Sequence, residues 1–151
     1  MTARSPSTRT IALAIGVFLL LFGVAGALPA LTAPLRGLTA LTVTGGAGLL
    51  FGLFPVNWLA DLAHLALGIW GILAAQRFVA ARSFLRAAAL ILAVLALCGL
   101  VPGAHLLFGL MPLNAHDVWL HGGLALLAAV FGWRAVSVTD EAGLTAAPVT
   151  D

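Results

Sequence analysis

The chain has 151 residues, of which 62% are hydrophobic and only 8% are charged, and its formal net charge is +2. Soluble globular domains carry about 25% charged residues, so this composition excludes a soluble monomer and indicates a membrane protein. The seven basic residues are all arginines and form no basic run, which excludes nucleic-acid binding.

Four apolar segments follow one another along the chain. A helix needs about 20 residues to cross a hydrocarbon core of roughly 30 Å. Backbone groups in lipid must pair within their own segment, so each crossing should be a helix. We therefore predict an all-α, integral membrane four-helix bundle over residues 10–135, embedded in a lipid bilayer. The crossings are residues 10–28, 57–76, 84–101 and 115–133.

Arginine placement predicts how the bundle is oriented. The loop between the first and second segments and the loop between the third and fourth lie on the same side of the membrane. These two loops contain only one arginine, Arg36. Because basic residues are enriched in cytoplasmic loops, the other side is the cytoplasmic one, and residues 1–9 and 136–151 are cytoplasmic tails. That side holds six arginines, Arg4, Arg9, Arg77, Arg82, Arg86 and Arg134.

The first segment also fits a secretory signal, because "AGA" at residues 25–27 is a small-residue cleavage site. However, "ALPA" after the first segment matches "LVPG" after the third, at Pro29 and Pro102. We therefore expect the first segment to remain as the structural counterpart of the third.

A nine-residue motif occurs twice, as "LLFGLFPVN" at residues 49–57 and "LLFGLMPLN" at residues 106–114. The chain thus divides into two-helix repeats, residues 10–76 and 84–135. Both repeats enter the membrane in the same direction, so we predict parallel repeats about a pseudo-two-fold axis along the membrane normal. The charge-poor stretch 39–54 is expected to lie on the membrane surface or to dip into it.

Polar residues follow each copy of the motif at similar spacing. The two asparagines suit helix N-caps, and at about 100° per residue each following Asp and His shares a face with its Asn. We expect the two histidines to approach each other near the axis, flanked by the two acids, with the second and fourth helices as neighbours. The predicted cluster is Asn57, Asp61, His64, Asn114, Asp117 and His121.

The stretch "LLFGLFPVNWLADLAHLALGIWG" and its second copy resemble a bacterial family of small membrane proteins known as domain of unknown function 4383. The resemblance extends from about Thr10 to Trp133. Family members often show "HN" where this chain has Ala60 and Asp61, so a histidine is missing here. The resemblance implies a four-helix protein of the bacterial inner membrane and implies no activity.

The polar cluster leaves several functions open. The first is interhelical polar glue near the outer side. The second is a haem or divalent-metal site at His64 and His121, with Asp61 and Asp117 as further metal ligands. The third is a proton or small-solute pathway. The chain could also serve as an accessory subunit with a membrane-protein partner, or form a homo-oligomer. No nucleophile–base pair or nucleotide motif is present, so an enzyme is not predicted.

Overall fold

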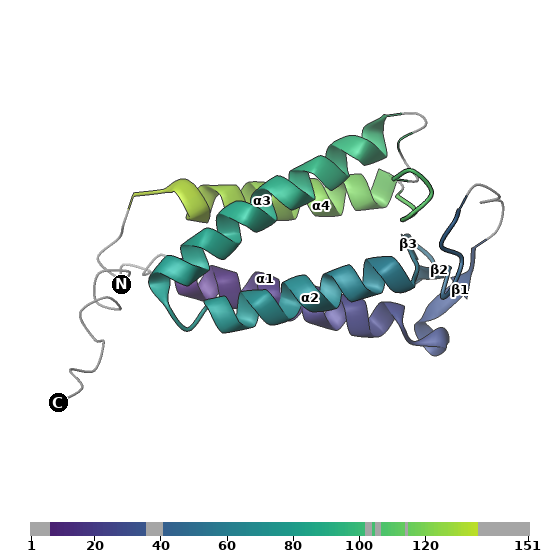
Figure 1. Cartoon of the computed structure of the whole chain (residues 1–151), viewed down its shortest axis with the longest axis horizontal. Coiled ribbons are helices and arrows are strands. Elements are labelled where there is room, and N and C mark those ends of the chain that lie inside the picture. The colour runs from purple at the N-terminus through teal and green to yellow at the C-terminus, as the bar shows by residue number, and fades with distance from the viewer. Residues whose placement is uncertain (1–6, 36–40, 102–103, 105–106, 114, 136–151) are drawn as a thin grey trace, which may run out of the picture.

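The computed structural model describes residues 7–35, 41–101, 104, 107–113 and 115–135. Over these residues the chain is mostly helical, with a small group of strands at one end (Figure 1). The predicted C-terminal tail, residues 136–151, and most of the N-terminal one lie outside the described residues. The helices are α1 (Thr8–Gly26), α2 (Trp58–Ala74), α3 (Phe78–Leu100) and α4 (Ala115–Trp133).

Most helix bounds agree with the predicted segments. The bounds of α4 are those predicted, and α1 and α2 deviate by two residues or fewer. The exception is α3, which begins six residues earlier than predicted, at Phe78, so that Arg82 lies inside the helix. No glycine or proline interrupts residues 72–98, so nothing in the backbone prevents this early start.

Three of these helices, α1, α3 and α4, are long and apolar enough to cross a membrane. The fourth, α2, is apolar but has only 17 residues. The helices pair as two hairpins, α1 with α2 and α3 with α4, which lie against each other (Figure 1). The main core is buried between the hairpins, where Ile15 and Leu19 of α1 meet Phe84 and Ala88 of α3.

Glycines let α1 and α2 approach each other closely. A Cβ atom added at Gly16 would lie 2.7 Å from the backbone nitrogen of Ile72. One added at Gly68 would lie 2.5 Å from the backbone nitrogen of Leu20. Neither distance is tolerated by real side chains, so this hairpin depends on small residues at its interface, as membrane helix pairs commonly do.

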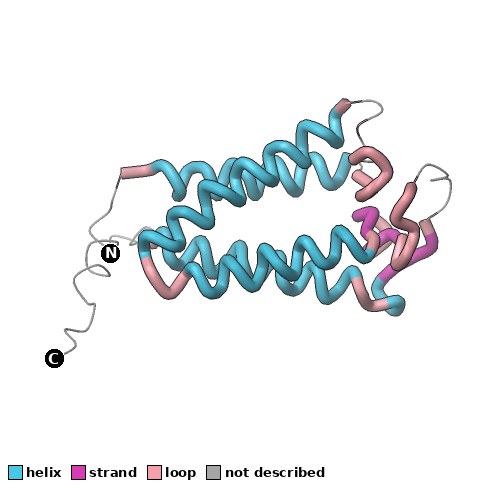
Figure 2. Tube along the Cα trace, viewed as in Figure 1, coloured by secondary structure: helices cyan, strands magenta, loops and turns pink. Residues whose placement is uncertain are grey.

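A small sheet corrects the prediction of an all-α fold. Its three short strands are antiparallel in the order β1-β2-β3 and lie at one end of the bundle (Figure 2). The stretch 39–54, expected on the membrane surface, contributes β2 and the turn into β3. Leu50 and Val56 are fully buried in this sheet and pack with Phe22 of α1, which explains why so apolar a segment is not an exposed loop. The strands are β1 (Thr32–Pro34), β2 (Gly48–Leu50) and β3 (Phe54–Val56).

The first copy of the doubled motif forms the tight turn between β2 and β3. The φ angles are +53° at Phe51 and +71° at Gly52. The backbone N–H of Leu53 donates to the carbonyl of Leu50 at 3.0 Å. Positive φ at both central residues is typical of type I′ turns, which suit β-hairpins.

The second copy forms the same kind of turn, although none of the described residues beside it form a strand. The φ angles are +60° at Phe108 and +84° at Gly109. The backbone N–H of Leu110 donates to the carbonyl of Leu107 at 3.1 Å. The repeated Phe-Gly pair therefore adopts the same backbone conformation in both copies, and its glycine adopts positive φ without steric cost because it has no Cβ atom.

Arginine side chains bind the C-terminal ends of the helices at the opposite end of the bundle. Arg9 Nε donates to the carbonyl of Ala75 at 2.8 Å, just after α2. Arg82 and Arg86 donate to the carbonyl of Gly132 in the last turn of α4, at 3.1 and 2.8 Å. The C-terminal end of a helix has unpaired carbonyl groups and carries partial negative charge. The guanidinium groups donate hydrogen bonds to these carbonyls and bring a compensating positive charge.

Replacing Gly52 with Ala tests the turn. A Cβ there meets open space, so the cost is purely conformational, and we expect a loss of about 1–2 kcal/mol in the free energy of unfolding. Reversible unfolding in mixed detergent micelles measures this loss of free energy. The control is Gly123→Ala in α4, which also faces open space and should be neutral or slightly stabilising. Equal effects from the two substitutions would contradict the assigned turn.

Candidate functional site

Asn57 connects the two halves of the chain. It is fully buried, and its Oδ1 accepts a hydrogen bond from the backbone N–H of Ala60 at 2.9 Å, which caps α2. Its Nδ2 donates to the carbonyl of Val43 at 3.0 Å and to that of Leu110 at 2.7 Å. Leu110 belongs to the second copy of the motif, so a single side chain joins the helix start, its own loop and the other repeat.

Backbone hydrogen bonds strengthen the same connection. The N–H groups of Thr42 and Val43 lie 2.8 and 3.3 Å from the carbonyl of Gly109 and donate to it. Gly109 is the positive-φ glycine of the second turn. The loop of the first repeat therefore packs onto the turn of the second.

His64 of α2 and His121 of α4 lie together between the hairpins. Their ring centroids are 6.2 Å apart and the ring planes differ by 18°. His121 is 4% exposed, whereas His64 is half-buried. Nδ1 of His64 lies 2.7 Å from the carbonyl of Ala60, which can only accept, so this nitrogen is the donor. α2 and α4, which were predicted to be neighbours, are not among the closely packed helix pairs, although the rings of His64 and His121 do meet.

A cavity of about 140 Å³ lies beside the histidine pair. Besides the two histidines, Asp117 is the polar residue that lines it, and this side chain is 5% exposed. The other described lining side chains are apolar and come from α1, α2, α3, β3 and the second loop. They include Phe22, Ala63, Leu92, Leu95 and Met111.

Asp61 lies elsewhere. Its side chain is 3% exposed and does not line the cavity. Its carboxylate lies against Gly26 of α1, where an added Cβ would overlap Oδ1. Within the described part of the chain, neither of its oxygens has a hydrogen-bond partner. The structure therefore does not bring the two predicted acids together.

The sequence contains the reason for this separation. Asp117 is the third residue after its motif asparagine, whereas Asp61 is the fourth after Asn57. One residue turns a side chain by about 100° around a helix. Asp117 therefore matches Ala60, which lines the cavity, and Asp61 turns toward α1.

The described residues do not support the metal and haem hypotheses. Across the described residues, no group of three or more His, Cys, Asp or Glu side chains could hold a metal ion. A cavity of about 150 Å³ accommodates one benzene ring, whereas a haem contains four pyrrole rings. The cavity is thus far too small for haem. Asn114, the remaining predicted member of the cluster, lies outside the described residues.

Sequence reasoning missed the lining contributed by α3 and by the second loop. Leu92, Leu95 and Met111 are ordinary apolar residues, and no local pattern distinguishes them from their exposed apolar neighbours. It also missed the hydrogen bond to the carbonyl of Leu110, because every residue has a backbone carbonyl and the residue type does not show which one accepts a hydrogen bond. The contact of Gly26 with Asp61 did leave a signal, since Gly16, Gly23 and Gly26 recur along α1.

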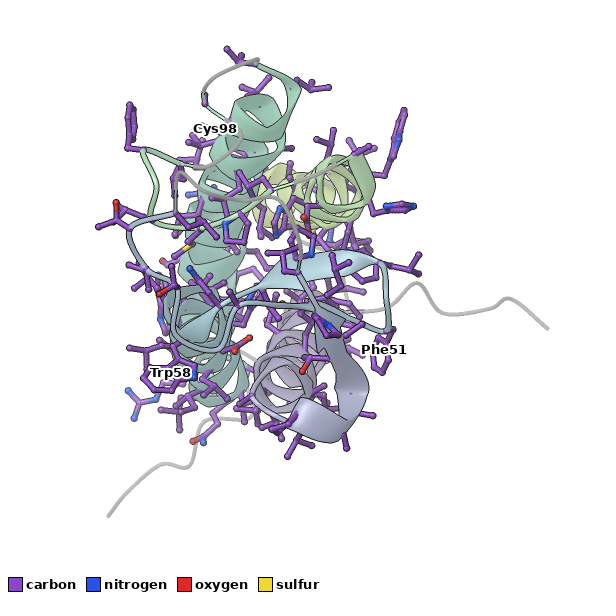
Figure 3. The ribbon with its side chains drawn as sticks, turned by 90° about the vertical axis from the view of Figure 1, so that its right-hand side faces the viewer. Phe51, Trp58 and Cys98 are labelled. Carbon is purple, nitrogen blue, oxygen red and sulfur yellow. The ribbon has the colours of Figure 1, made fainter. Side chains whose placement is uncertain are left out.

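Large aromatic side chains are exposed around the loop end of the bundle. Trp58 is 68% exposed and Trp119 is 81% exposed. Phe51 and Phe108, at the tips of the two turns, are 58% and 88% exposed. Figure 3 looks onto this end and shows Phe51 and Trp58 at opposite edges of the molecule. Exposed tryptophans near helix ends are typical of membrane–water interfaces.

A double mutant tests the Asp61 contact. Gly26→Ala should lower the free energy of unfolding by about 1–3 kcal/mol through overpacking. Asp61→Ala should be neutral or stabilising, because it removes a buried carboxylate that has no partner among the described residues. The double variant should recover most of the Gly26→Ala loss in the same micelle assay. The control is Gly122→Ala, because an added Cβ there would lie 4.0 Å from the nearest atom. If the stability effects of Gly26→Ala and Asp61→Ala simply add in the double variant, the two residues are not in contact.

Comparison with known proteins identifies a family without assigning an activity. A search of curated proteins finds no match, and a search of solved structures finds none either. A family model matches residues 9–134, which include all four helices except Thr8. The chain belongs to the family described as Domain of unknown function (DUF4383).

Proposed function

We propose that the protein spans the bacterial inner membrane four times and that its polar cluster fastens two equivalent hairpins together near the outer face. The hydrogen bond from Asn57 Nδ2 to the carbonyl of Leu110, 2.7 Å long, is the observation that carries this proposal. It joins the first hairpin to the loop of the second, and its donor residue, Asn57, is fully buried. Hydrogen bonds between membrane segments contribute about 0.6 to 2 kcal/mol each.

The four-span placement draws support from helix lengths. α1, α3 and α4 are long and apolar enough to span. The 17 residues of α2 extend about 25 Å at 1.5 Å per residue, and 17 is at the short end of the spanning range. Because α2 pairs with α1 along the hairpin, it would cross with its partner.

The orientation draws support from the arginines. Arg9, Arg82 and Arg86 all bind helix ends at the end of the bundle opposite the sheet. In the proposed placement this end faces the cytoplasm, as the enrichment of basic residues in cytoplasmic loops requires. The sheet, the doubled turns and the exposed tryptophans would then face outward.

The parallel repeat draws support from matched contacts. Arg9 and Arg82 each lie 20 residues before the matching prolines, Pro29 and Pro102. Their acceptors also match, since Ala75 and Gly132 each lie 18 residues after a motif asparagine. The same arginine-to-carbonyl hydrogen bond thus occurs in both hairpins. Two similar hairpins related by an axis along the membrane normal would produce this match.

Cysteine labelling tests the topology. In a Cys98→Ala background, Thr42→Cys should react with a membrane-impermeant maleimide in intact spheroplasts. Val79→Cys, which is 69% exposed at the start of α3, should react only after permeabilisation, because the proposed topology places it inside. Labelling of Val79→Cys in intact spheroplasts would reject the orientation.

Asn57→Ser tests the fastening role. Serine keeps the N-cap acceptor but lacks the amide donors to Val43 and Leu110. Two part-buried hydrogen bonds are lost, each worth about 0.5–1.5 kcal/mol, so we expect a loss of about 1–3 kcal/mol in the free energy of unfolding. Ser7→Asn, an exchange at the N-cap of α1, should have little effect. A stability unchanged in Asn57→Ser would show that the hairpins do not depend on this bond.

A further inference from the structure

Two arginines of α3 bind the same carbonyl at the end of α4. Nε of Arg82 and Nε of Arg86 donate to the carbonyl of Gly132 at 3.1 and 2.8 Å. Both guanidinium groups therefore lie within hydrogen-bond distance of one oxygen atom, so their positive charges are close neighbours. The two residues also stand four apart on one helix, a spacing at which like charges repel each other. An anion bound between them would relieve this repulsion.

The negative charge near these arginines is too small to balance them. The C-terminal end of a helix carries about half an elementary charge, whereas each of the two guanidinium groups carries a full one. The acidic residues in the described part of the chain are Asp61 and Asp117. They lie in the first turns of α2 and α4, at the opposite end of the bundle.

Most N–H donors of these two side chains have no partner in the described structure. A guanidinium has five N–H donors. Arg82 uses one for Gly132 and one for the carbonyl of Arg134, at 2.9 Å, and Arg86 uses one for Gly132. Neither arginine contributes to the buried polar atoms that lack a partner over the described ranges. Their remaining nitrogens are therefore open to the surface and can donate to an external group.

An aromatic ring places Arg86 at the depth of lipid headgroups. Its guanidinium carbon lies 5.6 Å from the ring centroid of Trp133, which is 51% exposed. Exposed tryptophans near helix ends are enriched at membrane–water interfaces. One turn further into the bilayer, Leu90 of α3 and Val130 of α4 are exposed as well. The acyl chains of a lipid held at Arg86 would therefore lie against apolar side chains.

We propose that Arg82 and Arg86 bind the phosphate of one anionic phospholipid. A guanidinium donates two parallel hydrogen bonds to phosphate oxygens, and basic pockets between membrane helices recognise lipid headgroups. The lipid must carry a net negative charge, because the positive group of a zwitterionic headgroup would meet the same excess of arginine. In the proposed orientation, on which the choice of leaflet rests, this lipid belongs to the cytoplasmic leaflet.

The first hairpin provides a matched control. Nε of Arg9 donates to the carbonyl of Ala75 at 2.8 Å, which is the same kind of bond at the end of α2. Across the described residues, however, no second guanidinium binds that carbonyl. We therefore expect a lipid site at the second hairpin and none at the first, although each hairpin has an arginine in the same role.

Native mass spectrometry of the full chain in detergent micelles tests this site. The chain is titrated with phosphatidylglycerol and with phosphatidylcholine that has the same acyl chains. We expect one phosphatidylglycerol to bind with at least about fivefold higher affinity, since each arginine beside an anionic lipid contributes about this factor. This comparison uses the unaltered chain and does not depend on the folding of a variant. Equal affinities for the two lipids would overturn the proposal.

Three variants locate the site. Arg82→Met and Arg86→Met should each lower the affinity for phosphatidylglycerol about fivefold. Arg9→Met, which removes the same charge and the same kind of bond, should leave the affinity unchanged. Circular dichroism verifies that each variant keeps its helices. An equal loss in all three variants would indicate general attraction to basic side chains and would reject the site.

Two further measurements separate the lipid from other anions. An excess of inorganic phosphate should not displace the bound lipid, and displacement would assign the site to free phosphate instead. Lipid binding that appears only after Asp140→Asn and Glu141→Gln would assign the site to the carboxylates of the C-terminal tail. Micelles have no leaflets, so failure of lipid binding would leave the topology, tested by labelling of Val79→Cys, unaffected.

Discussion

The side-chain amide of Asn57 connects parts of the chain that have little other reason to meet. It binds the start of α2, the loop before it and the turn of the other repeat. Backbone hydrogen bonds from Thr42 and Val43 to Gly109 support the same connection. The depth of α2, the position of the second turn and the approach of the histidines all follow from where this amide lies. Its complete burial makes the connection strong, because water cannot compete for the same groups.

The two ends of the bundle are held by different chemistry. At the sheet end, amide and backbone groups pair across the hairpins. At the other end, guanidinium groups bind helix carbonyls within each hairpin, as Arg9 does at Ala75. Long flexible side chains can follow small movements of a helix end, whereas a buried amide cannot. The contacts that join the two hairpins through the Asn57 amide therefore lie at the sheet end, on the same side of the bundle as the histidine rings and the cavity.

The sequence predicts the helices well and the sheet poorly, for physical reasons. An apolar run such as residues 115–133 determines a helix through its own backbone bonding. Pairing of Thr32 with Leu50 depends on chain segments far apart, and the residues between them resemble any apolar loop. The matched spacing from each motif asparagine predicts two histidines at one depth, and their rings lie 6.2 Å apart. A single-residue offset in the sequence directs Asp61 toward Gly26 instead, although Asp61 was predicted to flank the histidines together with Asp117. The cavity itself could not be predicted, since its lining side chains come from four helices.

The exposed phenylalanines at the tips of the two turns affect what stabilises this fold. Phe51 and Phe108 adopt a backbone conformation that costs side-chain-bearing residues about 1–2 kcal/mol, yet their rings are more than half exposed. Contacts with the described part of the chain leave more than half of each of these two residues uncovered. A large apolar ring at a fixed point on the surface gains free energy only when something outside the chain covers it. In the proposed orientation that cover is the interfacial layer of the lipid, so the bilayer would complete the packing of the two turns, and lipid thickness and composition would enter directly into the stability of the protein.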